Sequence, residues 1–169
     1  MNLTGNQVTL RQIKKDDFCY IVAWSKDPEV NRYYDAKQTE NMLDISHWYK
    51  NLKGNRYQKK FMILVNEQPI GDLEFDHIAW RSGEAELKIR IGEKDLWDKG
   101  YGTDAILVSL RYAFSKLNLN RIYLRVYADN GRAIRCYQKA GFVKEGRLGR
   151  KGSSREIILM SIQRFVDVS

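Results

Sequence analysis

A β-strand followed by a glycine-initiated helix is the feature that most restricts the fold of this sequence. Residues 84–91 alternate strictly between charged and apolar side chains, as in a strand with one face in the core. Gly100-Tyr101-Gly102 follows, and the apolar residues of 106–117 then recur at helical spacing. Glycines at a helix start leave backbone N–H groups open to a ligand, and the helix dipole adds about half a positive charge there. The pattern predicts an anion site suited to a pyrophosphate, although a helix start that needs glycine only for its turn has the same sequence.

The rest of the chain alternates similar elements and contains no repeat and no linker rich in Gly, Pro or Ser. We therefore expect a single domain over residues 1–169. Asp16 or Asp17 is expected to cap the first helix, and Gly141 to end the last one. Strands are expected at residues 8–13, 61–65, 70–77, 84–91, 122–126, 142–148 and 156–162, and helices at 17–24, 41–52, 103–117 and 132–140. This order predicts an α/β fold around a sheet of mixed direction.

The segment from Gly100 to Ala105 also matches the dinucleotide-binding pattern G-x-G-x-x-G/A. In that motif the first glycine follows directly on its strand, within a series of βαβ units. Here residues 92–99 intervene, and Asp129, the candidate acid for a ribose, lies far downstream. These departures disfavour a dinucleotide-binding oxidoreductase.

Two segments carry a resemblance to a known family. They are residues 97–105 (WDKGYGTDA) and 129–142 (DNGRAIRCYQKAGF). Together they resemble the two signature motifs of the GNAT superfamily of acetyl-CoA-dependent N-acetyltransferases. The stretches VTLRQIKKDDF and WSKDPEVNRYY are similar to this family as well, so the resemblance covers nearly the whole chain. The pattern is most similar to the branch of ribosomal-protein alanine N-acetyltransferases and spermidine acetyltransferases.

The resemblance implies a GNAT-like α/β fold, with helices on both faces of a mixed, mostly antiparallel sheet. The strand ending near Ile91 would splay from the strand at residues 122–126, and the pantetheine arm of acetyl-CoA would enter the gap. Backbone N–H groups around Ile89 would bind the arm and polarise the thioester carbonyl. The cofactor-binding residues implied are Ile89, Ile91, Trp97, Asp98, Lys99, Gly100, Tyr101, Gly102, Thr103, Asn130 and Arg132. No metal is expected.

Two residues are candidates for the proton transfers. Tyr137 matches the tyrosine that the family places near the sulfur of CoA, and a phenol of pKa about 10 can protonate the departing thiolate. A tyrosine that only packs is the alternative. Glu86 occupies the position where relatives often carry a glutamate facing the acceptor, and it could take the ammonium proton directly or through a water. A solvent-facing strand residue paired with a lysine is the alternative there.

The acceptor implied is a primary amine: a polyamine, a protein N-terminal amine or another small amine. The residues expected at its site are Tyr33, Tyr34, Asp72 and Glu74, although an acidic row on a strand more commonly faces water. The resemblance implies direct attack in a ternary complex. Cys136 is therefore expected to be a small buried residue and not a covalent acetyl carrier.

Charge is distributed unevenly along the chain. Residues 81–169 hold 18 basic and 10 acidic side chains, whereas residues 1–80 hold 11 of each. Part of the excess, at Lys99, Arg132 and Arg135, is assigned to the phosphates of CoA. A further group of basic residues surrounds one expected hairpin: Arg147, Arg150, Lys151 and Arg155. This group supports the alternative of a nucleic-acid- or ribosome-binding module, but aromatic residues are not interleaved with it, so nucleic acid is an unlikely partner. A GNAT fold that binds CoA without catalysis is the other alternative.

The sequence also gives expectations about compartment and assembly. Two cysteines, Cys19 and Cys136, are too few for a disulfide framework. The N-terminus has no signal-peptide pattern, and no stretch approaches 18 apolar residues. We therefore expect a cytoplasmic protein with no membrane segment. The resemblance allows a homodimer, for which the sequence shows no apolar seam.

Overall fold

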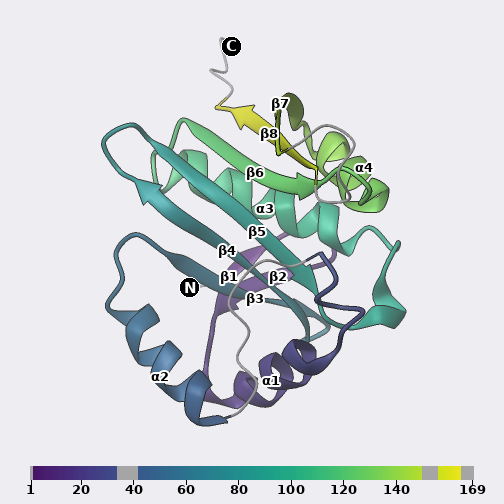
Figure 1. The fold of residues 1–169 in the computed structure, drawn as a ribbon. Coiled ribbons are helices and arrows are strands. Elements are labelled where there is room, and N and C mark those ends of the chain that lie inside the picture. The colour runs from purple at the N-terminus through teal and green to yellow at the C-terminus, as the bar shows by residue number, and fades with distance from the viewer. Residues whose placement is uncertain (1, 34–41, 150–155, 165–169) are drawn as a thin grey trace.

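The computed structural model describes residues 2–33, 42–149 and 156–164. At its centre is a sheet with the strand order β1-β2-β3-β4-β5-β6-β8-β7 (Figure 1). The strands are β1 (Asn2–Thr4), β2 (Thr9–Gln12), β3 (Lys59–Val65), β4 (Gln68–Ala79), β5 (Glu84–Ile91), β6 (Arg121–Tyr127), β7 (Val143–Leu148) and β8 (Ile157–Gln163). Neighbouring strands are antiparallel except for β5 and β6, which are parallel. The predicted mixed, mostly antiparallel sheet is confirmed.

Helices cover both faces of this sheet, as predicted (Figure 1). They are α1 (Phe18–Lys26), α2 (Met42–Lys53), α3 (Tyr101–Ser115) and α4 (Gly131–Ala140), with short 3₁₀ helices at Lys15–Asp17 and Lys94–Leu96. Successive side chains of a strand point to opposite faces, and β3 shows which helices lie on which face. Met62 packs in one cluster with residues of α1 and α2, whereas Phe61 and Ile63 pack in the other cluster with residues of α3 and α4.

The sheet opens between β5 and β6. The two strands pair only at Glu84↔Arg121, Ala85↔Ile122 and Glu86↔Tyr123. Both strands continue for four or five residues beyond this point, to Ile91 and Tyr127. The predicted splay is therefore present, and it begins directly after Glu86.

Asp72, Glu74 and Glu86 do not face water, so the alternative of a solvated strand face does not hold for these three residues. Asp72, Glu74 and Glu86 are 0%, 2% and 2% exposed, and Arg90 is 6% exposed. The reason is their position in the sheet: β4 and β5 are central strands, and Arg90 lies against Trp24 of α1. Buried charges are costly unless paired, and these residues are held in ion pairs and hydrogen bonds.

The structure also corrects the expected cap of α1. Asp17 precedes the helix but makes no side-chain hydrogen bond to its start. Its carboxylate instead accepts the backbone N–H of Lys14 at 2.8 Å and the Arg11 guanidinium at 2.7 Å. Asp17 therefore fixes the preceding 3₁₀ turn to β2. Gly141 does end α4 in the left-handed conformation, with φ of 108°, as expected.

The strands β1 and β2 form an N-terminal hairpin that is hydrogen-bonded to α3. The strand β1 was not predicted from the sequence. The buried carboxylate of Asp104, in the first turn of α3, accepts three backbone N–H groups between β1 and β2. These are the N–H groups of Asn6, Gln7 and Val8, at 3.1, 2.7 and 2.9 Å. A Cβ atom on Gly5 would lie 2.4 Å from Val108, so glycine is what allows this close approach.

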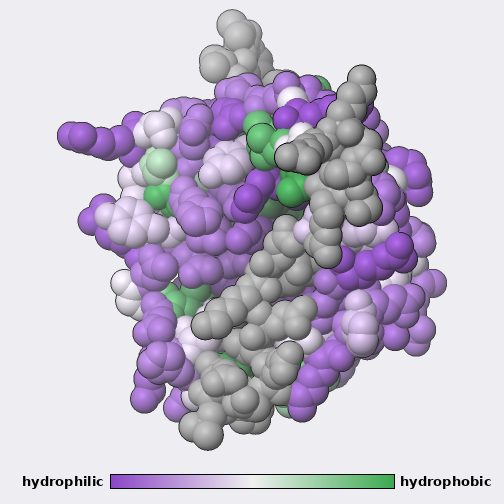
Figure 2. Space-filling model, viewed as in Figure 1, coloured by the Kyte–Doolittle hydropathy of each residue, from purple (hydrophilic) through white to green (hydrophobic). Residues whose placement is uncertain are grey.

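The surface drawn in Figure 2 is mostly hydrophilic over the described residues, with apolar side chains in small separate groups. Within the described ranges, no helix has the length and apolar character needed to cross a membrane.

Candidate active site

A cleft of about 320 Å³ opens where β5 and β6 separate. It is lined by the end of β5, the loop before α3, the start of α3, the end of β6 and one side of α4. Every residue that the resemblance implied for the cofactor lines this one cleft: Ile89, Ile91, Trp97, Asp98, Lys99, Gly100, Tyr101, Gly102, Thr103, Asn130 and Arg132. Tyr33 and Tyr137 line it too.

The backbone of β5 presents polar groups to this cleft. Gly92, directly after β5, donates its N–H to the Ile70 carbonyl on β4 at 2.7 Å. In an antiparallel pair the backbone groups of alternate residues point to the same neighbouring strand. The backbone N–H and C=O of Arg90 therefore also point to β4. The backbone groups of Ile89 and Ile91 therefore point the other way, toward β6, which has already diverged. Their N–H groups are thus directed at the cleft.

The start of α3 forms a second set of open backbone donors. Gly100 is its N-cap, at a φ of 86°, and contributes no side-chain cap. The N–H of Asp104 donates to the Gly100 carbonyl at 3.1 Å, so the N–H groups of the preceding turn have no partner within the helix. Gly100 is suited to this left-handed position because it lacks a Cβ atom. This arrangement fits the predicted site for a pyrophosphate.

The charge of the cleft fits a polyanion. Its charged lining within the described ranges comprises six basic and two acidic side chains: Arg90, Lys99, Arg125, Arg132, Arg135 and Lys139, with Glu29 and Asp98. The phosphates of CoA carry about four negative charges at neutral pH, which such a basic lining attracts.

Trp97 joins the two walls of the cleft, a role that the sequence did not reveal. Its indole N–H donates to the Ile91 carbonyl at 2.8 Å and so fixes the end of β5. The Arg132 guanidinium of α4 lies 3.9 Å from the centroid of the Trp97 ring, in cation–π geometry. Asn130 is likewise structural as well as cleft-lining, because its side chain caps α4 by accepting the N–H of Ala133 at 3.3 Å.

Replacing Gly102 by alanine should separate binding from folding. A Cβ atom there would lie 3.7 Å from the Cys136 sulfur and 3.9 Å from Ile91, which is ordinary contact, but it would project into the cleft. We expect the KM for acetyl-CoA to rise about 10-fold, since ligand and backbone can no longer approach closely, with the free energy of unfolding unchanged or about 0.5–1 kcal/mol higher. Gly54→Ala, where nothing lies within 4 Å, is the control and should leave KM unchanged. An unaltered KM in the Gly102 variant would place the ligand elsewhere.

A smaller pocket of about 50 Å³ adjoins the cleft. Its lining comprises Tyr33, Glu86, Leu87, Lys88, Ile89, Arg125, Val126, Tyr127, Tyr137 and Ile157. Five of these residues line the cleft as well: Tyr33, Ile89, Arg125, Val126 and Tyr137. The two spaces therefore meet at the point where β5 and β6 diverge. Tyr137 stands at this junction, with its ring 5.9 Å from that of Phe142.

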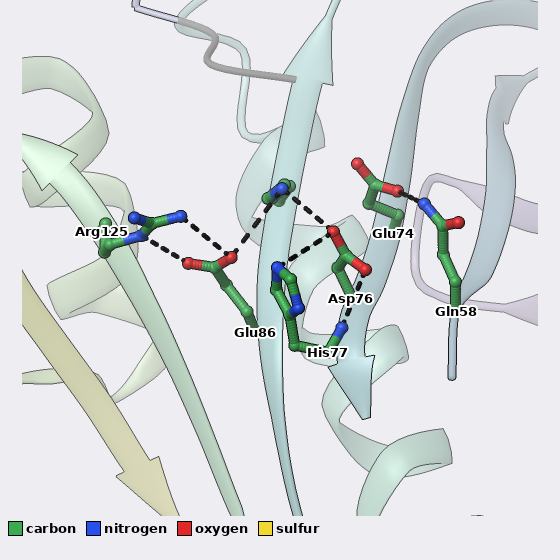
Figure 3. Close-up of polar contacts among 7 residues, drawn as sticks. Gln58, Glu74, Asp76, His77, Glu86 and Arg125 are labelled. Carbon is green, nitrogen blue, oxygen red and sulfur yellow. Dashed lines mark hydrogen bonds and ion pairs between the residues drawn. The ribbon is translucent and has the colours of Figure 1, made fainter. Parts of the chain in front are cut away.

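A chain of charged side chains crosses β4, β5 and β6 beside the smaller pocket (Figure 3). Glu86 accepts Nε of Arg125 at 2.7 Å and Nη2 at 3.3 Å. Lys88 lies 3.8 Å from Glu86 and donates to Asp76 at 3.1 Å. Burial alone would raise the pKa of Asp76, but the His77 N–H and the Lys88 ammonium hold it below its usual value. Asp76 is thus ionised at neutral pH.

Two of the residues predicted for the acceptor site lie apart from both spaces. Asp72 pairs with Arg90 at 2.7 Å and lies 3.9 Å from Lys60, and Glu74 accepts the Gln58 amide at 2.5 Å (Figure 3). Neither lines the cleft or the smaller pocket. Tyr33 lines both, and Tyr34 lies outside the described residues.

Two other sequence expectations can be placed. Cys136 lines the cleft, 3.2 Å from the Thr103 hydroxyl. Burial raises the pKa of its thiol, so little reactive thiolate forms at neutral pH.

In the basic hairpin, Arg147 donates to Glu156 at 2.8 Å, whereas Arg150, Lys151 and Arg155 fall outside the described residues. Across the part of the chain that the structure describes, no cluster of His, Cys, Asp and Glu could hold a metal ion.

Comparison with known proteins identifies related chains. A family model described as an acetyltransferase (GNAT) domain matches residues 7–143. An uncharacterized N-acetyltransferase, p20, of Bacillus licheniformis is 30% identical over 154 residues, covering 86% of this chain and 84% of the relative. Spermidine N(1)-acetyltransferase of Escherichia coli K12 is 28% identical over 145 residues, covering 86% and 77%.

The fold also matches a solved structure. The crystal structure of spermidine N-acetyltransferase from Vibrio cholerae in complex with CoA and spermine superimposes with a TM-score of 0.84 at 26% identity. The match covers 93% of this chain and 95% of that chain.

Proposed function

Since this chain belongs to the GNAT family of acetyltransferases, it is an N-acetyltransferase that uses acetyl-CoA, and we propose that it acetylates a primary amine by direct attack in a ternary complex. The single observation that carries the proposal is the meeting of the cleft and the smaller pocket at shared residues. A donor in the cleft and an acceptor in the pocket are in contact there, with no protein nucleophile needed between them.

In this proposal the divided sheet supplies the electrostatic part of catalysis. The N–H of Ile89 donates to the thioester carbonyl oxygen and stabilises the negative charge that forms when the amine attacks. This attack forms the new N–C bond and a tetrahedral intermediate, and the C–S bond breaks when the intermediate collapses. Tyr137 gives its hydroxyl proton to the departing sulfur, and so the thiol leaves uncharged.

Glu86 is the proposed acceptor of the ammonium proton, because it is the single carboxylate among the described residues that line the smaller pocket. Its two oxygens also accept hydrogen bonds from Arg125. The same surroundings reduce the need for a strong base: Arg125 and Lys88 are cations, and nearby cations lower the pKa of an ammonium group.

The names of the relatives indicate which acceptors to test first. Several of them are named as spermidine acetyltransferases, and one solved relative is described with spermine. Spermidine and spermine therefore belong in any acceptor panel, together with N-terminal peptide amines and other small amines. A cytoplasmic location and a homodimer stay predictions from the sequence.

The test is thiol release from acetyl-CoA against this panel. We expect release that depends on an added amine, with initial-velocity lines that intersect when both substrates are varied. Parallel lines would point to a covalent acetyl-enzyme and contradict direct transfer. CoA binding without release for any amine would instead support the non-catalytic alternative.

A further inference from the structure

We propose that Arg90 is a positioning residue that places the acceptor amine against the thioester. It acts through residues 28–33, the turn that follows α1 (the post-α1 turn). Its buried guanidinium joins this turn to β5 beside Ile89, whose N–H is assigned to the thioester carbonyl. The inference rests on the proposed direct transfer and adds a residue that controls where the amine lies.

The post-α1 turn forms one wall of both spaces. Glu29, Val30 and Tyr33 line the cleft, and Tyr33 lines the smaller pocket as well. The Tyr33 ring lies 6.1 Å from that of Tyr127, which also lines the smaller pocket. An amine in the smaller pocket is therefore bounded by this turn on one side and by β5 and β6 on the other.

Asn31 joins the post-α1 turn to β5. Its amide nitrogen donates to the carbonyls of Trp24 and Asp27, at the end of α1, at 2.6 and 2.8 Å. Because both amide hydrogens are used in this way, the amide oxygen is the atom left for a further partner. It accepts Nη1 of Arg90 at 3.1 Å. A second link, from Lys94 to Asp27 at 2.9 Å, involves a side chain that is 40% exposed, where water competes for the bond.

The guanidinium of Arg90 is held from two further sides. Nη2 donates to Asp72 of β4 at 2.7 Å, and the guanidinium carbon lies 5.9 Å from the centroid of the Trp24 ring in α1. The side chains of Arg90 and Asp72 are 4% and 0% exposed. A guanidinium is planar, so its two donors fix the direction of one partner relative to the other. Arg90 thus sets where the post-α1 turn lies over β4 and β5.

Stability alone does not explain this buried pair. Taking two charges out of water costs about as much free energy as their attraction returns, so apolar side chains often serve a core as well. The compensation here is incomplete, because no group in the described part of the chain donates to Oδ1 of Asp72. The strand β5 is held independently of Arg90, by its pairing with β4 and by the bond from Trp97 to Ile91. What Arg90 determines is therefore the place of the post-α1 turn, and with it that of Tyr33.

Arg90→Met tests the proposal directly. The variant keeps an unbranched apolar side chain and loses the bond to Asn31, while Lys60 remains 3.9 Å from Asp72. We expect kcat to fall about 10-fold and the KM for the amine to rise, because misplacing a positioned group by about 1 Å can cost up to about 10²-fold. The KM for acetyl-CoA should change less than about 3-fold, since Trp97 still holds the end of β5. Steady-state thiol release, with the best amine of the panel, gives all three constants.

Asn31→Ala removes the same bond from the other end. Asn31 is only half-buried, so this variant should fold even if Arg90→Met does not. It should lower kcat and raise the KM for the amine in the same way. If Arg90 acts through Asn31, the loss of kcat/KM in Asn31→Ala/Arg90→Met should be well below the product of the two single losses. A residue that only stabilises the core would not show this coupling.

Arg11→Met is the matched control. Arg11 also pairs with a buried carboxylate, that of Asp17 at 2.7 Å, but it lines neither the cleft nor the smaller pocket. Its loss should lower the urea midpoint of unfolding and leave kcat and both KM values within about 2-fold of the parent. The control thereby separates a loss of stability from a loss of position.

Three results would overturn the proposal. They are parental kinetics in both single variants, independent losses that multiply in the double variant, and an equal loss of kcat in Arg11→Met. Each of them leaves the transferase proposal intact, because the parent still releases thiol in the presence of an amine. A parent that releases no thiol with any amine of the panel would remove both proposals.

Discussion

Replacing Tyr137 by phenylalanine should lower kcat by about 10²–10⁴-fold, the range found when a general acid is lost. The substitution removes only the phenolic O–H and keeps the ring that lies 5.9 Å from Phe142. Without that donor, sulfur must leave as a thiolate, and breakdown of the tetrahedral intermediate becomes slow. Steady-state thiol release over a range of pH, with CoA affinity measured separately, gives the effect on kcat alone.

Tyr112→Phe is the matched control for this prediction. Tyr112 is a buried residue of α3 that packs edge-on against Phe61, and it lines neither the cleft nor the smaller pocket. Removing its hydroxyl should leave kcat unchanged. If the Tyr137 variant turned over as fast as the parent at every pH, Tyr137 would not be the proton donor.

Replacing Asp104 by alanine should lower the free energy of unfolding by about 3 kcal/mol, because a buried or half-buried donor left without its partner costs about 1–3 kcal/mol. The substitution removes the hydrogen-bond acceptor of three N–H groups at once, those of Asn6, Gln7 and Val8. It also removes an acidic residue from the first turn of α3, where the helix dipole favours one. Urea denaturation followed by circular dichroism measures the change.

Two further variants calibrate that loss. Asp104→Asn keeps one acceptor oxygen and should recover about half of the lost stability. Asp95→Ala removes an exposed carboxylate from the 3₁₀ helix before α3 and should stay within about 0.5 kcal/mol of the parent. A loss below about 1 kcal/mol in Asp104→Ala would mean that water replaces the carboxylate on those three groups.

The order of helices and strands could be predicted because each has a local pattern. The alternation over residues 84–91 fixed that strand without any knowledge of its neighbours. The same alternation could not show that Glu86 and Arg90 are buried, because the residues against them, Arg125 of β6 and Trp24 of α1, come from distant parts of the sequence. The strand β1 was missed because three residues carry no period, and its turn depends on Asp104 almost a hundred positions away.

The candidate site also has one part that the sequence predicts and another that it does not. The residues implied for CoA gather in one cleft because two local motifs, at residues 97–105 and 129–142, start the helices on its walls. The bond from Trp97 to Ile91 and the pairing of Arg125 with Glu86 depend on how far β5 and β6 separate. No local pattern in the sequence encodes that separation.

The separation of β5 and β6 has a consequence for self-association. The sheet has unpaired strand edges in its interior as well as at its outer strands, and such edges are the usual starting points of edge-to-edge aggregation. Here the inner edges diverge and lie in a concave cleft, so a flat strand from another molecule does not fit between them. A slender ligand with its own amide groups does, and the pantetheine arm of CoA has this chemistry. The same geometry that admits the substrate thus protects the protein from pairing with itself.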